Sequence, residues 1–149
     1  KLFVSPGLNN LGDLLHEAGH LAMVPSCFRH LVSAVEFPGR ALEDAVKTYV
    51  ETHEFTTDYQ EDPVFRAILQ MGECEATAWS YAALCVLGYP SHLLFEVRDD
   101  GSYPFQSKEE AETVASGLAS RSYFGINGLQ ASKQCLVRTF PKMQRWLAV

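Results

Sequence analysis

Apolar residues recur at helical spacing through most of this chain, with polar residues between them. Segments of this kind bury one face and predict amphipathic helices. Five helices are expected, between Asn10 and Pro25, over 42–50, from 62 to about 88, from 107 to about 120, and from about 126 to 137.

Two regions carry shorter apolar runs that are typical of strands. Residues 31–37 predict one strand, which ends at Pro38. Residues 93–97 and 103–105 flank an Asp-Asp-Gly turn, which indicates a hairpin, and Pro104 restricts its second strand to a sheet edge. The expected fold class is therefore α+β, mainly helical, with a short sheet.

Length and composition predict one globular domain. The chain has 149 residues, of which 47% are hydrophobic and 20% are charged. Its net charge of −6 and the lack of any Lys/Arg cluster argue against a nucleic-acid partner. No apolar run reaches the roughly 18 residues of a membrane span, so no membrane partner is expected. The sequence begins at Lys1 rather than Met, which is consistent with a start inside a longer product.

The four cysteines, Cys27, Cys74, Cys85 and Cys135, show no CxxC spacing. Cys74 and Cys85 fall on one predicted helix, about 16 Å apart along its axis, which is too far for a disulfide. We therefore expect reduced thiols in a cytoplasmic protein.

The stretch 14–22 contains His16-Glu17-x-x-His20. On a helix, His20 lies about 40° and Glu17 about 100° around the axis from His16, so the three side chains share one side. A lone helical histidine is more often a solvated side chain, but here the apolar residues occupy the opposite face. Two imidazoles one turn apart suit Zn²⁺, and the carboxylate between them suits a general base. Gly19 has no Cβ and lets a neighbouring backbone or a substrate approach closely.

Catalytic zinc normally has three protein ligands, and the long helix offers Glu73 or Glu75 as the third. These two side chains point about 160° apart, so only one of them can face the metal. Glu75 shares its face with Trp79, which we expect to be largely buried among apolar side chains. The residues on the other face are small and allow the first helix to approach: Ala76, Thr77 and Ser80. Helix geometry therefore favours Glu73.

These two motifs together resemble the gluzincins, a group of zinc metallopeptidases in which a glutamate on a downstream helix completes the site. The run 73–77 is similar to the Glu-x-Glu-Ala-Asn of small cytosolic members that cleave phage-type repressors, with Thr77 in place of Asn. The resemblance covers the two motif helices only. It implies a minimal zincin-like fold, Zn²⁺ held by His16, His20 and Glu73, and a zinc-activated water with Glu17 as general base.

Two functions remain open at this stage. The first is a zinc-dependent metallopeptidase that acts on a peptide or protein substrate. The second is a non-catalytic zincin-fold module that binds metal and acts as a regulator or partner-binding domain. Glu17 favours the enzyme, because a structural zinc site needs no base. Four side chains are candidate donors to the oxyanion of such a reaction, although each is more often structural: His53, His92, Tyr81 and Tyr123.

Overall fold

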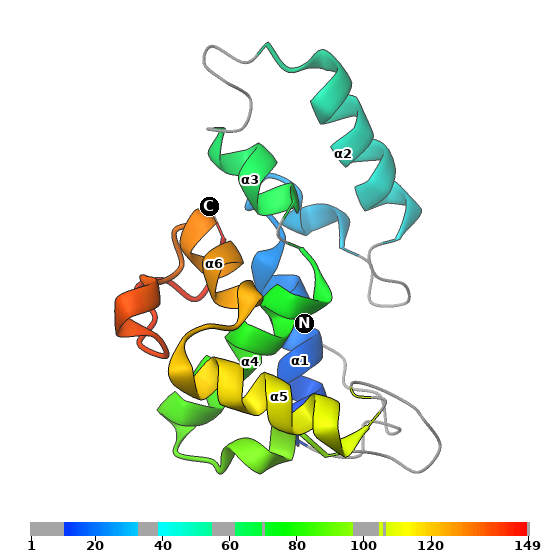
Figure 1. Ribbon diagram of the computed structural model, residues 1–149. Helices are drawn as coiled ribbons and strands as arrows, with labels where there is room; N and C mark the ends of the chain where they lie inside the picture. The colour runs from blue at the N-terminus through cyan, green and yellow to red at the C-terminus, as the bar shows by residue number, and fades with distance from the viewer. Residues whose placement is uncertain are drawn as a thin grey trace.

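Helices make up the described structure. The computed structural model describes residues 11–32, 39–54, 62–69, 71–96, 105 and 107–148 (Figure 1). The α-helices are α1 (Leu11–Met23), α2 (Arg40–Thr52), α3 (Pro63–Leu69), α4 (Glu73–Leu87), α5 (Lys108–Ser120) and α6 (Phe124–Ala131). Short 3-10 turns are η1 (Arg29–Leu31), η3 (Ser91–Leu94) and η4 (Val137–Thr139). No described helix is both long and apolar enough to cross a bilayer.

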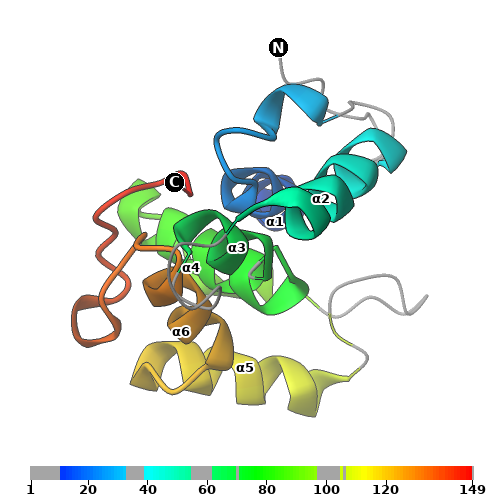
Figure 2. The same ribbon diagram turned by 90° about the horizontal axis from the view of Figure 1, so that it is seen from above.

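Helix α4 lies at the centre of the molecule. It packs against α1 along one side and against α6 along another, and α1–α4 is the most extensive of these contacts. Figures 1 and 2 show α5 and α2 at opposite ends of this central group, with α3 near α2. The arrangement leaves α1 and α4 side by side, which brings the two sequence motifs together.

Two apolar clusters hold the helices. The main core joins α1, α4, α5 and α6 and contains Met23, Ala78, Ala82, Leu118, Ile126, Leu129, Cys135 and Phe140. The second core, which packs α2 and α3 against the chain after α1, contains Val24, Phe28 and Leu42. Met71, between α3 and α4, packs against both clusters and connects them.

The expectation of a short sheet is wrong for the residues that the structure describes. They contain six α-helices and no strand, with one isolated antiparallel bridge between Cys135 and Met143, so the fold of this part is all-α. Leu31 is the last residue of the turn η1, and its amide donates to the carbonyl of Phe28 at 2.9 Å in a bond of the i to i+3 type. Residues 33–37 of the predicted strand lie outside the described residues.

The predicted hairpin also differs from the structure where it can be compared. Its first strand begins in the turn η3, in which Leu94 is buried. Phe95 follows and packs on Tyr81 and Phe105, with ring centroids 6.3 and 5.7 Å apart. Three consecutive apolar residues can enter a core from a turn as well as from a strand, because so short a run shows no periodicity. Residues 97–104 lie outside the described part.

The helix boundaries confirm most of the remaining expectations and correct two. Helix α5 starts after its Ser107 cap, whose hydroxyl accepts from the amide of Glu110 at 3.1 Å. The helix expected over 62–88 is two helices, α3 and α4, and Gly72 caps the second with extended backbone. Glycine is a poor interior helix residue, which favours a break there. Helix α6 ends at Ala131 rather than at 137.

Candidate metal centre

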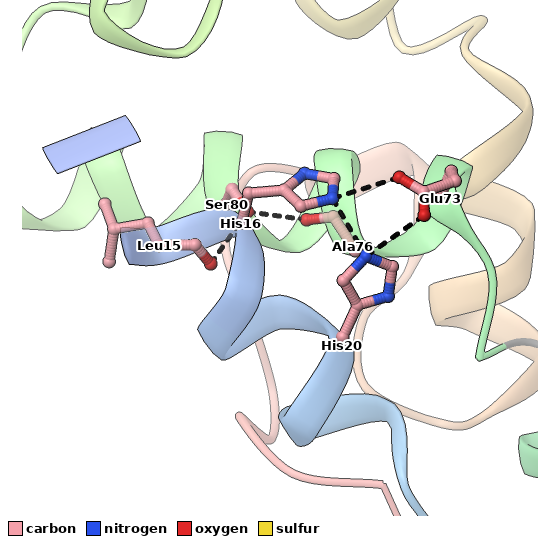
Figure 3. A network of polar contacts seen from close by, with 6 residues as sticks. All are labelled: Leu15, His16, His20, Glu73, Ala76 and Ser80. Atoms are coloured by element: carbon pink, nitrogen blue, oxygen red, sulfur yellow. Dashed lines mark hydrogen bonds and ion pairs between the residues drawn. The ribbon is translucent and has the colours of Figure 1, made fainter. Parts of the chain in front are cut away.

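The side chains of His16, His20 and Glu73 converge on one point between α1 and α4. The Nε2 atoms of the two histidines are 2.9 Å apart. One carboxylate oxygen of Glu73 lies 3.1 Å from His16 Nε2, and the other lies 3.3 Å from His20 Nε2 (Figure 3). Among the described residues, this is the group of three or more metal-ligating side chains whose donor atoms approach one another closely.

Helix α1 presents both histidines on its buried side, which faces α4. The apolar residues expected to form its core face are only partly buried at Leu14, Ala18 and Leu21, so that expectation is wrong for them. The His16 side chain is 1% exposed and that of His20 is 10% exposed, so the neighbouring helix covers both. The Glu73 side chain is 69% exposed, so the point of convergence has one side open to solvent. A catalytic metal site requires such an open side, because a water or substrate occupies a position that the protein leaves free.

Glu73 is in the first turn of α4 because Gly72 begins that helix. The break between α3 and α4 therefore has a direct consequence for the site, because it places Glu73 at the start of α4. The sequence-based expectation of one continuous helix over 62–88 did not include this role of Gly72, although a glycine within an expected helix was the available signal.

The electrostatics of the histidines favour metal binding. Burial, and secondarily the neighbouring His20, lower the pKa of His16 to about 3. His16 is therefore neutral near pH 7 and has a lone pair available on one ring nitrogen. An ionised carboxylate only accepts hydrogen bonds. A neutral imidazole, a second imidazole and a carboxylate thus direct electron-rich atoms at a common point, an arrangement that a cation stabilises.

The distances among these atoms fit a zinc ion. Tetrahedral zinc with bonds of about 2.0–2.1 Å places its ligand atoms roughly 3.3 Å apart. The separations of 2.9, 3.1 and 3.3 Å lie close to that value, and the last two involve different oxygens of the Glu73 carboxylate. With one ligand atom taken from each residue, the three atoms lie within 4.8 Å of one another. Two imidazoles and one carboxylate also form the donor set of known catalytic zinc sites. The residues present therefore fit Zn²⁺.

The two remaining glutamates of the motifs have different surroundings. Glu17 is exposed on α1, beside the buried His16 in the sequence. Glu75 is only 4% exposed, and it is not a member of the ligand group. Burial raises the pKa of Glu75. The structure thus places Glu73 with the histidines and Glu75 elsewhere, as helix geometry indicates.

Trp79 packs against the main core, on apolar neighbours as expected. Its ring centroid is 5.4 Å from that of Trp146, and its indole N–H donates to the Trp146 carbonyl at 2.8 Å. Part of the side chain remains accessible, and Trp79 is not one of the ligands.

Thr77, at the position where gluzincins have Asp or Asn, makes its side-chain hydrogen bond with Tyr123. The Tyr123 hydroxyl also bonds with the thiol of Cys74, and burial raises the pKa of Tyr123. Tyr123 therefore contacts Cys74 and Thr77, which both lie near the start of α4. Among the candidate oxyanion donors, it is the one with contacts nearest Glu73 in the sequence.

The other candidate oxyanion donors have structural surroundings. The Tyr81 ring stacks on Phe140 in the core, with centroids 5.8 Å apart. His53 stacks on Tyr49 with centroids 4.5 Å apart, at the end of α2. His92 is exposed in the turn η3. None of these contacts connects the three side chains to the ligand group.

No family model, curated protein or solved structure matches the chain. What the protein does must therefore be inferred from the chemistry of its own residues. The three converging side chains, with Glu17 next to His16 in the sequence, are the features that support such an inference.

Proposed function

We propose that this protein is a zinc-dependent hydrolase that cleaves peptide bonds, with His16, His20 and Glu73 as zinc ligands and Glu17 as general base. The observation that carries the proposal is the convergence of three zinc-type donors at separations of 2.9 to 3.3 Å. The open side at Glu73 supports catalysis over a purely structural role, because a structural zinc site is usually closed by four protein ligands.

A zinc ion held by His16, His20 and Glu73 would supply Lewis acidity and would lower the pKa of a water at its open position. Glu17 would accept a proton from the attacking water as the water oxygen bonds to the peptide carbonyl carbon. Glu17 would then deliver that proton to the amide nitrogen as the C–N bond breaks, which gives an amine and a carboxylic acid. His16 and His20 are held by burial, which limits their movement during this exchange.

The cysteines support the compartment that we propose. All four thiols are free of disulfides, which supports a reducing compartment such as the cytoplasm. We propose a cytoplasmic peptide or protein as substrate.

A Glu17→Gln variant tests the chemistry separately from metal binding. It keeps the shape of the side chain but removes the base, so zinc should remain at one ion per chain. Chelator-sensitive cleavage of a peptide library should fall about 10²-fold or more. Glu109→Gln, an exposed glutamate in the first turn of α5, is the matched control and should cleave like the wild type.

Equal cleavage by the Glu17→Gln variant and the wild type would exclude Glu17 as the base. One bound zinc per chain with no cleavage of any library peptide by the wild type would favour the alternative, a metal-binding module that acts through a partner.

A further inference from the structure

The two helices that provide the zinc ligands touch backbone to backbone at Gly19 and Ala76. A Cβ built on Gly19 would lie 2.7 Å from the Ala76 carbonyl oxygen and 3.0 Å from its Cα. Atoms this close must move apart, and here the neighbour is backbone rather than a flexible side chain. Gly19 lies between the two histidines in the sequence, and Ala76 lies one turn after Glu73. A close backbone contact of α1 and α4 therefore lies beside the ligands.

A buried hydroxyl joins the same two helices. Ser80 is fully buried, and its Oγ lies 2.9 Å from the carbonyl oxygen of Leu15 on α1. The same atom lies 2.6 Å from the carbonyl oxygen of Ala76 on its own helix. Both carbonyls accept from this one hydroxyl, so Ser80 connects the residue before His16 to the residue one turn after Glu73 (Figure 3).

We infer that Gly19 and Ser80 are positioning residues for the zinc site: they fix the spacing of α1 and α4 so that Glu73 reaches the metal held by the two histidines. This inference rests on the proposed zinc site. It adds two residues that touch neither metal nor substrate but determine whether the three ligands meet at one point.

The tolerance of a metal site makes this spacing important. Ligand distances in zinc sites fall within about 0.2 Å of their ideal values. A methyl group at Gly19 forces α1 and α4 apart by several tenths of an ångström if its contact with Ala76 is to become ordinary. Glu73 is on one helix and both histidines are on the other, so this separation acts directly on the bond between Glu73 and the metal.

The effect on the metal can be separated from an effect on the helix. Alanine forms helices better than glycine, so Gly19→Ala does not weaken α1 through its intrinsic propensity. Gly117 on α5 is the matched control, because a Cβ there would meet Tyr123 Cβ at an ordinary 3.4 Å. Ser80→Ala removes the hydroxyl and adds no atom, so it tests the bridge without a steric clash.

The test measures the zinc dissociation constant of the full chain by competition with a chromophoric chelator, for the wild type and for Gly19→Ala, Ser80→Ala and Gly117→Ala. Visible absorption of the Co²⁺-substituted proteins reports ligand geometry in the same samples. We expect zinc affinity to fall about 100-fold in Gly19→Ala and about 10-fold in Ser80→Ala, both with altered Co²⁺ spectra. Gly117→Ala should match the wild type in both measurements.

A purely structural role predicts a different result. In that case Ser80→Ala would lower the melting temperature of the metal-free protein but leave the zinc dissociation constant and the Co²⁺ spectrum unchanged, which would overturn the inference. If Gly19→Ala does not fold, Ser80→Ala decides the question alone. A wild type that binds no zinc would refute the metal site itself. Equal zinc binding by the wild type and all variants would instead refute only the positioning role of Gly19 and Ser80.

Discussion

Two parts of this molecule hold their helices together in different ways. Helices α1 and α4 touch through backbone at Gly19 and Ala76. Helix α2 is held through side chains: its Tyr49 hydroxyl donates at 3.1 Å to Asp62, the residue before α3. The Tyr49 ring also packs edge-on against Phe28, in the chain after α1, with centroids 5.7 Å apart. Contacts through long side chains adjust by rotamer changes, whereas a backbone contact does not.

Both parts bring a histidine near a carboxylate, but only one builds a metal-type site. His53 Nε2 lies 3.7 Å from Asp62 in the α2–α3 part, and no third ligand among the described residues joins them. In the α1–α4 part, Glu73 meets two histidines. The difference shows that the metal-type site depends on a third donor and on fixed helix spacing, and not on a His–carboxylate pair alone.

The largest expected effect separates these two histidine environments. His16→Ala or His20→Ala should weaken zinc binding by about 10³-fold or more, because each removes one of three ligands. His53→Ala removes a histidine from the other part and should keep one zinc per chain. Metal analysis after dialysis checks all three variants. Equal zinc loss from His53→Ala would mean that the two parts are not distinct.

A core substitution in the α2–α3 part should have a large effect on stability and little effect on the metal. Leu42 is fully buried in the second core, so Leu42→Ala should reduce the free energy of unfolding by about 2–5 kcal/mol. Val50→Ala on the same helix, at a side chain 42% exposed, should change it by less than about 0.5 kcal/mol. Denaturant unfolding measures both, and zinc titration should give the wild-type affinity in each folded variant. A large drop in zinc affinity for Leu42→Ala would contradict the separation.

The third expected effect is on the pH dependence of stability, and it is the smallest for a change of one pH unit. Burial lowers the pKa of His16 from 6.5 to about 3 in the folded chain, so the unfolded chain binds a proton there first as pH falls. The stability from a neutral His16 is complete above about pH 6.5 and is lost as pH falls toward 3. The free energy of unfolding of metal-free protein should lose about 1.4 kcal/mol per pH unit from this residue within that window.

Denaturant unfolding at a series of pH values measures this slope. His16→Gln is the control, since it has no ionisable ring. Its free energy of unfolding should change less steeply with pH than that of the wild type, by the contribution of one proton, about 1.4 kcal/mol per pH unit. Identical slopes for the two proteins would show that His16 is protonated in the folded state as readily as in the unfolded state.

The sequence predicts well what local pattern determines. Helix α5 begins after the Ser107 cap as expected, and α2 covers the predicted 42–50. The phase of the His16-Glu17-x-x-His20 motif places both histidines on the face that meets α4. Geometry along one helix also separates Glu73 from Glu75, because their directions follow from residue spacing alone.

Structural features that depend on contacts between distant segments cannot be predicted from the local sequence pattern. The expected strands contain apolar runs too short to distinguish a strand from a turn that enters the core, as Leu94 in η3 shows. The bridge from Ser80 to Leu15 joins residues 65 positions apart, so no local signal indicates it. The break at Gly72 was visible as a glycine but needed the packing of α3 and α4 to become a helix start.

The most direct test of the zinc centre compares Glu73→Ala with Glu75→Ala, two glutamates of the same helical turn. Zinc content and dissociation constant are measured for each purified, folded variant. We predict that Glu73→Ala weakens zinc binding by orders of magnitude, whereas Glu75→Ala, which removes a buried carboxyl outside the ligand group, keeps one zinc per chain with nearly wild-type affinity. Zinc retained by Glu73→Ala and lost by Glu75→Ala would contradict the assignment of Glu73 as the third ligand.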